Sequence, residues 1–259
     1  MRSSCWLCPS LCLALCVAGI ATAEPVSPPL RVAAASDLAL VLNELGAVWE
    51  RKTGQKIMVT IGATGMLSRQ LVEGAPFDAF LAADVDSVDA PARSGQCAAD
   101  SRRIYARGRL AVWTRLPPPP TTLEALADPQ FRRIAIANPA HAPYGRAAEA
   151  ALRKAGVWDK ISTRIVHADN VQRALELART GNVDVALVAA SLVQRAGGGL
   201  FLVDDKLHPP IEQAAIACGR EARLVAARAF VEFLGSGEAQ TTLGTYGFEP
   251  PTGGRVRKP

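Results

Sequence analysis

The chain has 259 residues, nearly half of them hydrophobic, which allows one large domain or two modest ones with a sizeable core. The formal charge is +5, but the basic residues are dispersed apart from the run RVRK at 255–258. Dispersed charge gives little support to nucleic-acid binding, whereas a mild positive excess would assist the capture of a small anion.

The first 23 residues have the pattern of a secretory signal peptide. Arg2 precedes an apolar stretch that ends in Ala-Thr-Ala, a typical cleavage sequence. No later segment reaches the roughly 20 consecutive apolar residues that span a bilayer. We therefore expect a soluble exported protein. Cys16 follows a weak lipoprotein signal in which Leu15 stands where a small residue is usual, so a lipid anchor is not expected.

Two cysteines, Cys97 and Cys218, remain after the leader is removed. They lie far apart in the sequence. In an oxidising compartment they either form a disulfide or stay as two separate buried thiols, and the sequence leaves both possibilities open.

The predicted elements alternate between strands and helices along the chain. Strands are expected at 31–35, 57–61, 77–83, 109–113, 133–137, 164–168, 183–190, 200–203 and 211–219. Helices are expected at 38–54, 65–74, 144–155, 171–180, 221–235 and 237–245. The four prolines at 117–120 indicate a surface loop. This alternation predicts an α/β protein with parallel sheets and crossover helices.

Several strands end in small or hydroxylic residues just before a helix begins. These junctions are at Ser36, at 62–65, at 143–145 and at 170–171. Ligands of open α/β sheets lie at the carboxyl ends of strands, and helix N-termini bind anions through free N–H groups and the helix dipole. Each junction alone can be an ordinary helix cap. Together, in both halves of the chain, they indicate a site for an anion or small polar ligand.

Longer motifs at these junctions resemble a known family. They are AAAS at 33–36, IGATGMLSRQLVEGAPFDAFLAAD at 61–84, IAIANPAHAPYG at 134–145, HADNVQRAL at 167–175 and YGF at 246–248. In order and spacing, from about residue 30 to 250, they resemble the periplasmic molybdate/tungstate-binding proteins of ABC transporters. The resemblance implies a two-lobed type II periplasmic binding fold. Each lobe would be a mostly parallel sheet flanked by helices, with one tetrahedral oxyanion in the cleft between them.

The resemblance also implies where the lobes and the ligand contacts lie. Lobe 1 would comprise 29–108 plus 210–259, and lobe 2 would comprise 109–209. The hydroxyl of Ser36 would bind the anion, as would that of Thr64, where a serine is more usual in the family. The backbone N–H groups of Tyr144 and Val171 would complete the set.

Three further residues are candidates for the same site: Asp37, Gly65 and Asn170. Some family members add a tyrosine hydroxyl from the strand at 183–190, but this sequence has Ala189 there. It therefore resembles the branch that lacks this donor. No cofactor is expected, and no residue is expected to ligate the metal atom of the anion directly.

Asp37 allows two interpretations. In the first, its side chain lies in the first turn of a helix and points to solvent, where it favours the helix dipole. In the second, it lies in the site, where an ionised carboxylate supplies no donor and repels a dianion. Molybdate and tungstate carry no proton at neutral pH, whereas phosphate does and would welcome an acceptor such as Asp37.

An exported enzyme on the same fold is the main rival hypothesis. His141, His167 and His208 show no metal-binding spacing, and no nucleophile-elbow motif is present. His141 and His167 lie near the expected cleft segments and are expected to be surface or loop histidines, with a supporting role beside the ligand contacts as the alternative. An exported adhesion or signalling domain would not require the junctions at all.

The sequence thus predicts a monomeric periplasmic receptor that captures molybdate or tungstate and delivers it to the membrane permease of an ABC transporter. Sulfate or phosphate is the alternative ligand. The sequence does not separate molybdate from tungstate.

Overall fold

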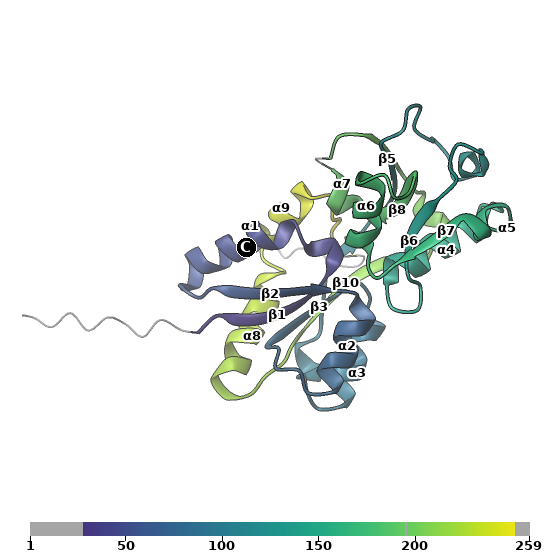
Figure 1. Cartoon of the computed structure of the whole chain (residues 1–259). Helices are drawn as coiled ribbons and strands as arrows, with labels where there is room; N and C mark the ends of the chain where they lie inside the picture. The colour runs from purple at the N-terminus through teal and green to yellow at the C-terminus, as the bar shows by residue number, and fades with distance from the viewer. Residues whose placement is uncertain (1–27, 195, 252–259) are drawn as a thin grey trace, which may run out of the picture.

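The computed structural model describes residues 28–194 and 196–251. The predicted signal peptide, the question of a lipid anchor at Cys16 and the basic run at 255–258 lie outside these residues. Among the described residues, no helix is long and apolar enough to cross a membrane. Figure 1 shows two lobes, one built from the purple, blue and yellow elements and the other from the teal and green ones.

The first lobe is built on a five-stranded sheet in the order β2-β1-β3-β10-β4. Its strands are β1 (Leu30–Ala35), β2 (Ile57–Gly62), β3 (Ala79–Ala82), β4 (Arg103–Gly108) and β10 (Ile211–Ala217). β1 is parallel to β2 and β3, whereas β10 is antiparallel to β3 and β4. β1 is the first strand of the described chain and β10 is the last, so this lobe contains both ends of the described residues.

Helices cover both faces of this first sheet. The helices are α1 (Val41–Thr53), α2 (Thr64–Val72), α3 (Asp86–Arg93), α8 (Glu221–Phe233) and α9 (Gly237–Thr245). Apolar residues of α1, α8 and α9 form one core, in which Trp49 packs against Phe230 and Phe233 at ring-centroid distances of 5.3 and 5.5 Å. Residues of α2 and α3 form a second core on the opposite face.

The second lobe is built on a sheet in the order β7-β6-β8-β5-β9. Its strands are β5 (Leu110–Thr114), β6 (Ile134–Ala137), β7 (Ile165–Ala168), β8 (Val185–Ala189) and β9 (Gly199–Leu202). Its helices are α4 (Pro143–Lys154), α5 (Trp158–Ile161), α6 (Val171–Arg179) and α7 (Ala190–Val193). β6 is parallel to β7 and β8, and β5 is antiparallel to β8 and β9.

The sheets are mixed, which corrects the expectation that each is mostly parallel. In both lobes the antiparallel pairs involve a strand next to a passage between the lobes, β10 in the first and β5 in the second. Four helices or strands were not predicted: β4, α3, α5 and α7, of which the last two are only four residues long. The segment RIYARG of β4 lacks a regular apolar alternation, and α3 is short and contains Pro91. Short 3₁₀ turns also occur, at Ser36–Leu38 (η1), Ala99–Ser101 (η2), Glu124–Ala127 (η3), Ser162–Arg164 (η4) and Asp205–Leu207 (η5).

The chain passes between the lobes twice, and a cluster of charged residues ties the passages together. The first passage, between β4 and β5, contains Arg109; the return, between β9 and β10, contains Asp205. Arg109 pairs with Asp205 at 3.0 Å and with Glu249, near the end of the described chain, at 2.6 Å. Arg107 also pairs with Glu249. Glu249 is thereby fixed beside the two passages between the lobes.

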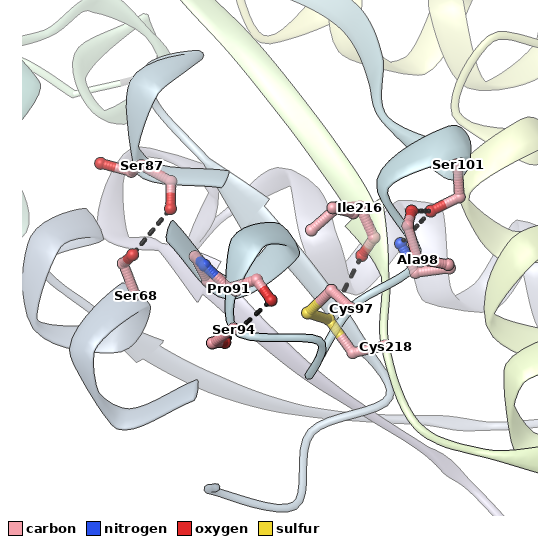
Figure 2. Close-up of a disulfide and its surroundings, with 10 residues drawn as sticks. Ser68, Ser87, Pro91, Ser94, Cys97, Ala98, Ser101, Ile216 and Cys218 are labelled. Atoms are coloured by element: carbon pink, nitrogen blue, oxygen red, sulfur yellow. Dashed lines mark hydrogen bonds between the residues drawn. A yellow bond between two sulfur atoms is a disulfide. The ribbon is translucent and has the colours of Figure 1, made fainter. Parts of the chain in front are cut away.

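A disulfide joins Cys97 to Cys218, resolving the two possibilities that the sequence left open. Figure 2 shows it between the segment that follows α3 and the end of β10. The neighbouring backbone pairs as well: the N–H of Ala98 donates to the carbonyl of Ala217 at 2.8 Å, and the N–H of Ala217 donates to Oγ of Ser101 at 2.9 Å. Both passages to the second lobe fall within the 121 residues that separate the two cysteines.

Candidate anion-binding site

A small cavity lies where four of the strand-to-helix junctions meet. Its volume, measured as the space open to the centre of a water molecule, is about 10 Å³. The first lobe contributes Ala35, Ser36, Asp37, Gly62, Ala63, Thr64 and Ala83; the second contributes Ala142, Pro143, Tyr144 and Val171. All four primary candidates, Ser36, Thr64, Tyr144 and Val171, therefore line one cavity. Typical sites for drug-sized ligands measure hundreds of Å³, so this one fits only a compact ligand.

The first lobe presents two hydroxyl groups to the cavity. Ser36 follows β1 and begins η1, and Thr64 begins α2 after β2; both are almost fully buried. Oγ1 of Thr64 accepts a hydrogen bond from the N–H of Ala83 at 3.2 Å. Within the described residues, the hydroxyl of Ser36 has no hydrogen-bond partner. Both hydroxyls thus have a proton to donate to a ligand.

The second lobe presents the first turns of two helices. Pro143 is the first residue of α4 and has no N–H to leave unpaired, so Tyr144 carries the first donor of that helix. Val171 is the first residue of α6, after the cap Asn170. N–H groups of a first helical turn have no partner within the helix, and the dipole places positive potential there.

The other candidates occupy different places. The N–H of Gly65 donates to the carbonyl of His141 at 2.8 Å, a bond between the lobes. The side chain of Asn170 caps α6 by accepting from the N–H of Arg173 at 2.9 Å. Neither residue lines the cavity, and neither does Ala189, which is buried and precedes α7.

The side chain of Asp37 does not point to solvent, which corrects the first of the two interpretations. Asp37 is only 1% exposed and lines the cavity. Its Oδ2 accepts from Nε2 of Gln213 at 2.7 Å, and its backbone carbonyl accepts from Oγ of Ser191, also at 2.7 Å. Its Oδ1 is buried without a hydrogen-bond partner. Burial raises the pKa of this carboxyl to about 7, against the opposing effect of the nearby Tyr144 hydroxyl and Gln213 amide.

Two tyrosines complete this polar cluster. The hydroxyl of Tyr105 donates to Oε1 of Gln213 at 3.4 Å. The hydroxyl of Tyr144 is buried and near enough to Asp37 to affect its pKa, but it makes no hydrogen bond of ordinary geometry. It lies against Gly108, at whose position a Cβ would be 2.0 Å from the hydroxyl oxygen. Burial and the charge of Asp37 raise the pKa of both tyrosines well above 10, so both are neutral.

No lysine, arginine or histidine is among the cavity's lining residues. His167 is exposed, and His141 contributes its backbone carbonyl to the bond with Gly65. Within residues 28–194 and 196–251, no group of three or more histidine, cysteine, aspartate or glutamate side chains is placed to hold a metal ion. An anion in this cavity would thus meet hydroxyl and N–H dipoles rather than cations.

Comparisons with known proteins agree with this architecture. The model of the bacterial extracellular solute-binding protein family matches residues 30–249. The chain belongs to this family. It is 33% identical over 207 residues to the molybdate-binding protein ModA of Rhodobacter capsulatus, covering 80% of this chain and 82% of that protein.

Two comparisons involve Azotobacter vinelandii. Its molybdate-binding protein ModA is 31% identical to the solute-binding protein described here, covering 89% of this chain and 94% of the relative. The solved structure of the periplasmic molybdate-binding protein from the same organism superposes with a TM-score of 0.82 at 29% identity, covering 86% of this chain and 99% of the other. The two-lobed fold of the solute-binding protein is thereby established along nearly its whole described length.

Sequence reasoning missed the residues of the solute-binding protein that hydrogen-bond to the cavity-lining residues Asp37 and Thr64. Gln213 and Ser191 hold Asp37, and Ala83 orients Thr64. One signal was available: Gln213 is a polar residue directly before the apolar run AAIA of β10. Nothing in the local sequence of Ser191 or Ala83 indicates these contacts.

Proposed function

We propose that this protein is a periplasmic receptor that captures molybdate or tungstate between its lobes and delivers it to the permease of an ABC transporter. The observation that carries the proposal is the composition of the cavity. Ser36 and Thr64 from one lobe, which have hydroxyl groups, and Tyr144 and Val171 from the other, which stand in the first turns of α4 and α6, all line it. The protein would act as a monomer and perform no chemistry on the anion.

A site built from donors suits these two anions. Molybdate and tungstate carry no proton at neutral pH, so all of their oxygens accept hydrogen bonds. Each hydrogen bond to a charged group contributes roughly 1.5–3 kcal/mol, and four or more such bonds in a closed cavity give useful affinity without a cation. The small volume supports a compact tetrahedral anion over a larger solute.

The relatives support the same ligand class. Both ModA proteins named above are molybdate-binding proteins by name, and they match the chain at 33% and 31% identity over most of their length. Sulfate remains the alternative of similar charge, and we expect its smaller size to lower its affinity.

Capture would occur by closure of the two lobes about the hinge. Contacts between the lobes include the bond from Gly65 N–H to the His141 carbonyl and that from the Ser191 hydroxyl to the Asp37 carbonyl. Arg146 of α4 pairs with Asp84 beside the cavity. These contacts form only when the lobes are together, so a ligand that bridges them shifts the population toward the closed form.

The test is calorimetric titration of the purified, anion-stripped protein with molybdate, tungstate, sulfate and phosphate. We expect one-to-one binding of the first two, with sulfate and phosphate at least a hundredfold weaker. Tighter binding of phosphate would change the ligand assignment and make Asp37 an acceptor of the phosphate proton. No binding of any of the four anions would refute the proposal.

A further inference from the structure

Asp37 places a carboxyl group in the wall of a cavity that we assign to a dianion. Its side chain is buried, and the cavity has no cationic side chain in its lining to offset a third negative charge. Uncompensated like charges at short distance in a medium of low dielectric constant are strongly unfavourable. The ligand-bound site therefore needs either a different ligand charge or a neutral carboxyl group.

The arrangement around the carboxyl group accommodates a proton at one defined atom. Oδ2 already accepts from the amide of Gln213 at 2.7 Å, whereas Oδ1 is buried and has no partner. The hydroxyl of Tyr144 lies nearby and also lacks a partner. A proton on Oδ1 would convert this oxygen into a donor, for which the Tyr144 oxygen is a candidate acceptor.

The side chains that face Asp37 provide no charge that would hold it ionised. β10, β4 and α4 present Gln213, Tyr105 and Tyr144, and the two tyrosines are neutral because their pKa values are raised well above 10. From α7, Ser191 contacts the Asp37 carbonyl, and α7 (ASLV) has no ionisable residue.

Charged residues on the surrounding elements are engaged elsewhere. On α6, which packs on η1, Arg173 pairs with Glu176, and Arg179 is exposed. At the hinge, Arg107 and Arg109 pair with Glu249 and Asp205. The charge of Glu212, beside Gln213 on β10, helps to raise the pKa of Arg107. Glu44 of α1 accepts a hydrogen bond from the Tyr246 hydroxyl at 2.6 Å.

We propose that Asp37 couples anion capture to protonation: when the dianion enters the cavity, the carboxyl group takes up one proton from solvent on Oδ1. The occupied site then holds two negative charges instead of three. This inference rests on the proposed function. It gives Asp37 a role in binding in addition to that of the hydrogen-bond donors. Asp37 would make the site sensitive to the charge of its ligand and to the pH of the medium.

Coupling of one proton to binding has a defined signature. Below the pH at which Asp37 of the ligand-free protein ionises, the carboxyl group is already neutral and affinity is constant. Above it, each unit of pH weakens binding by about tenfold, because one proton must be taken up for each anion. The transition is expected near pH 7, the value to which burial raises the pKa of Asp37.

The experiment is titration calorimetry of the protein with molybdate between pH 5.5 and 9, at each pH in two buffers of different ionisation enthalpy. The difference in heat between the buffers counts the protons taken up. For the wild type we expect uptake to rise from near zero at pH 5.5 to about one at pH 9, with a parallel loss of affinity. In Asp37→Asn, an uncharged group of the same shape, uptake should be near zero and affinity the same throughout.

A matched control separates Asp37 from other carboxylates at the junction. Asp84 follows β3 beside the cavity and pairs with Arg146, but it does not line the cavity. Asp84→Asn should keep the proton uptake of the wild type. If the Asp37→Asn variant fails to fold, the carboxyl ¹³C resonance of Asp37 in the wild type gives the same answer, since its pKa should rise when molybdate is added.

The outcomes distinguish this inference from the proposed function. Tight molybdate binding without proton uptake at any pH would leave the receptor function intact and overturn the role of Asp37. Proton uptake that persists in Asp37→Asn would assign the proton to another group and overturn it as well. No molybdate binding at any pH would refute both.

Discussion

The backbone N–H of Ala83 donates to Oγ1 of Thr64 at 3.2 Å, and both residues line the cavity. A hydroxyl that accepts one hydrogen bond still has its own proton to donate. Ala83 follows β3 and Thr64 follows β2, so the sheet of the first lobe fixes the orientation of this donor within a single lobe. Closure then has only to bring the helix ends of the second lobe to a hydroxyl that is already in place.

Replacing Thr64 by valine should weaken anion binding and also lower stability. The variant loses one donor to the ligand, which corresponds to roughly tenfold to over a hundredfold in affinity. It also leaves the Ala83 N–H without its acceptor, which costs about 1–3 kcal/mol in the free energy of unfolding. Calorimetry and urea unfolding measure the two effects. Thr64→Ser is the control and should keep both the molybdate affinity and the free energy of unfolding of the wild type. Equal molybdate affinity in Thr64→Val and the wild type would exclude Thr64 from the site.

Ser36→Ala should separate binding from stability. The hydroxyl of Ser36 has no hydrogen-bond partner within the described residues, so its removal should change the free energy of unfolding by less than about 0.5 kcal/mol. Molybdate affinity should fall by roughly tenfold to over a hundredfold, because a hydrogen bond to the charged ligand is lost. An unchanged dissociation constant would show that the hydroxyl does not contact the anion.

Gly65→Ala should hinder closure without harming the fold. A Cβ at this position would lie 3.0 Å from the carbonyl oxygen of His141 and 3.3 Å from its Cα, both in the other lobe. Alanine favours a helix over glycine by about 1 kcal/mol, so unfolding should shift to equal or higher temperature. Molybdate binding should weaken by about tenfold, as measured by calorimetry.

The matched control for that substitution is Gly244→Ala in α9, where a Cβ would meet nothing within 4 Å. It should stabilise the protein slightly and leave affinity unchanged. If Gly65→Ala behaves in the same way as this control, the contact between Gly65 and His141 has no part in closure.

That the four primary candidates line one cavity was predictable because their signals are local. Ser36, Thr64, Tyr144 and Val171 each stand at the end of an apolar strand segment or the start of a helix, and the family motifs specify their order. The burial of Asp37 was not predictable in the same way. An aspartate in a first helical turn is normally favoured at the surface by the helix dipole. Only Gln213, 176 residues later, shows that this one is enclosed.

For the fold as well, elements with strong local sequence patterns were predicted and those with weak patterns were not. Strongly periodic segments such as α1 and β6 were placed to within a few residues, whereas β4 and α3 were missed because Arg103–Gly108 and Asp86–Arg93 have weak or interrupted patterns. The mixed sheets were not predicted because the local sequence does not encode strand direction. The directions of β5 and β10 depend on the two passages of the chain between the lobes.

Removing the disulfide should lower stability and leave binding intact. The bond closes a loop with a sequence separation of 121 residues, and in the chain-entropy model loops of this size are stabilised by up to about 5 kcal/mol, with 2–4 kcal/mol typical. Neither Cys97 nor Cys218 lines the cavity. Urea unfolding of the double alanine variant should match that of the reduced wild type, and molybdate titration should match the oxidised wild type. A loss of affinity in the variant would show that the bond positions the lobes.

The ligand-free protein should lose stability as pH rises from about 4 to 7, through Asp37. The folded-state pKa of this carboxyl is about 7, above the ordinary value of 3.8, so the folded protein holds a proton that the unfolded chain releases. Its contribution is therefore complete below about pH 4, falls as pH rises toward 7 and is constant above that. Asp37→Asn cannot lose this proton, so its stability relative to the wild type should grow by up to about 4 kcal/mol over this range. Urea unfolding at intervals of half a pH unit measures the difference, with Asp84→Asn as the control. A difference that stays constant with pH would show that Asp37 does not titrate between the folded and unfolded states.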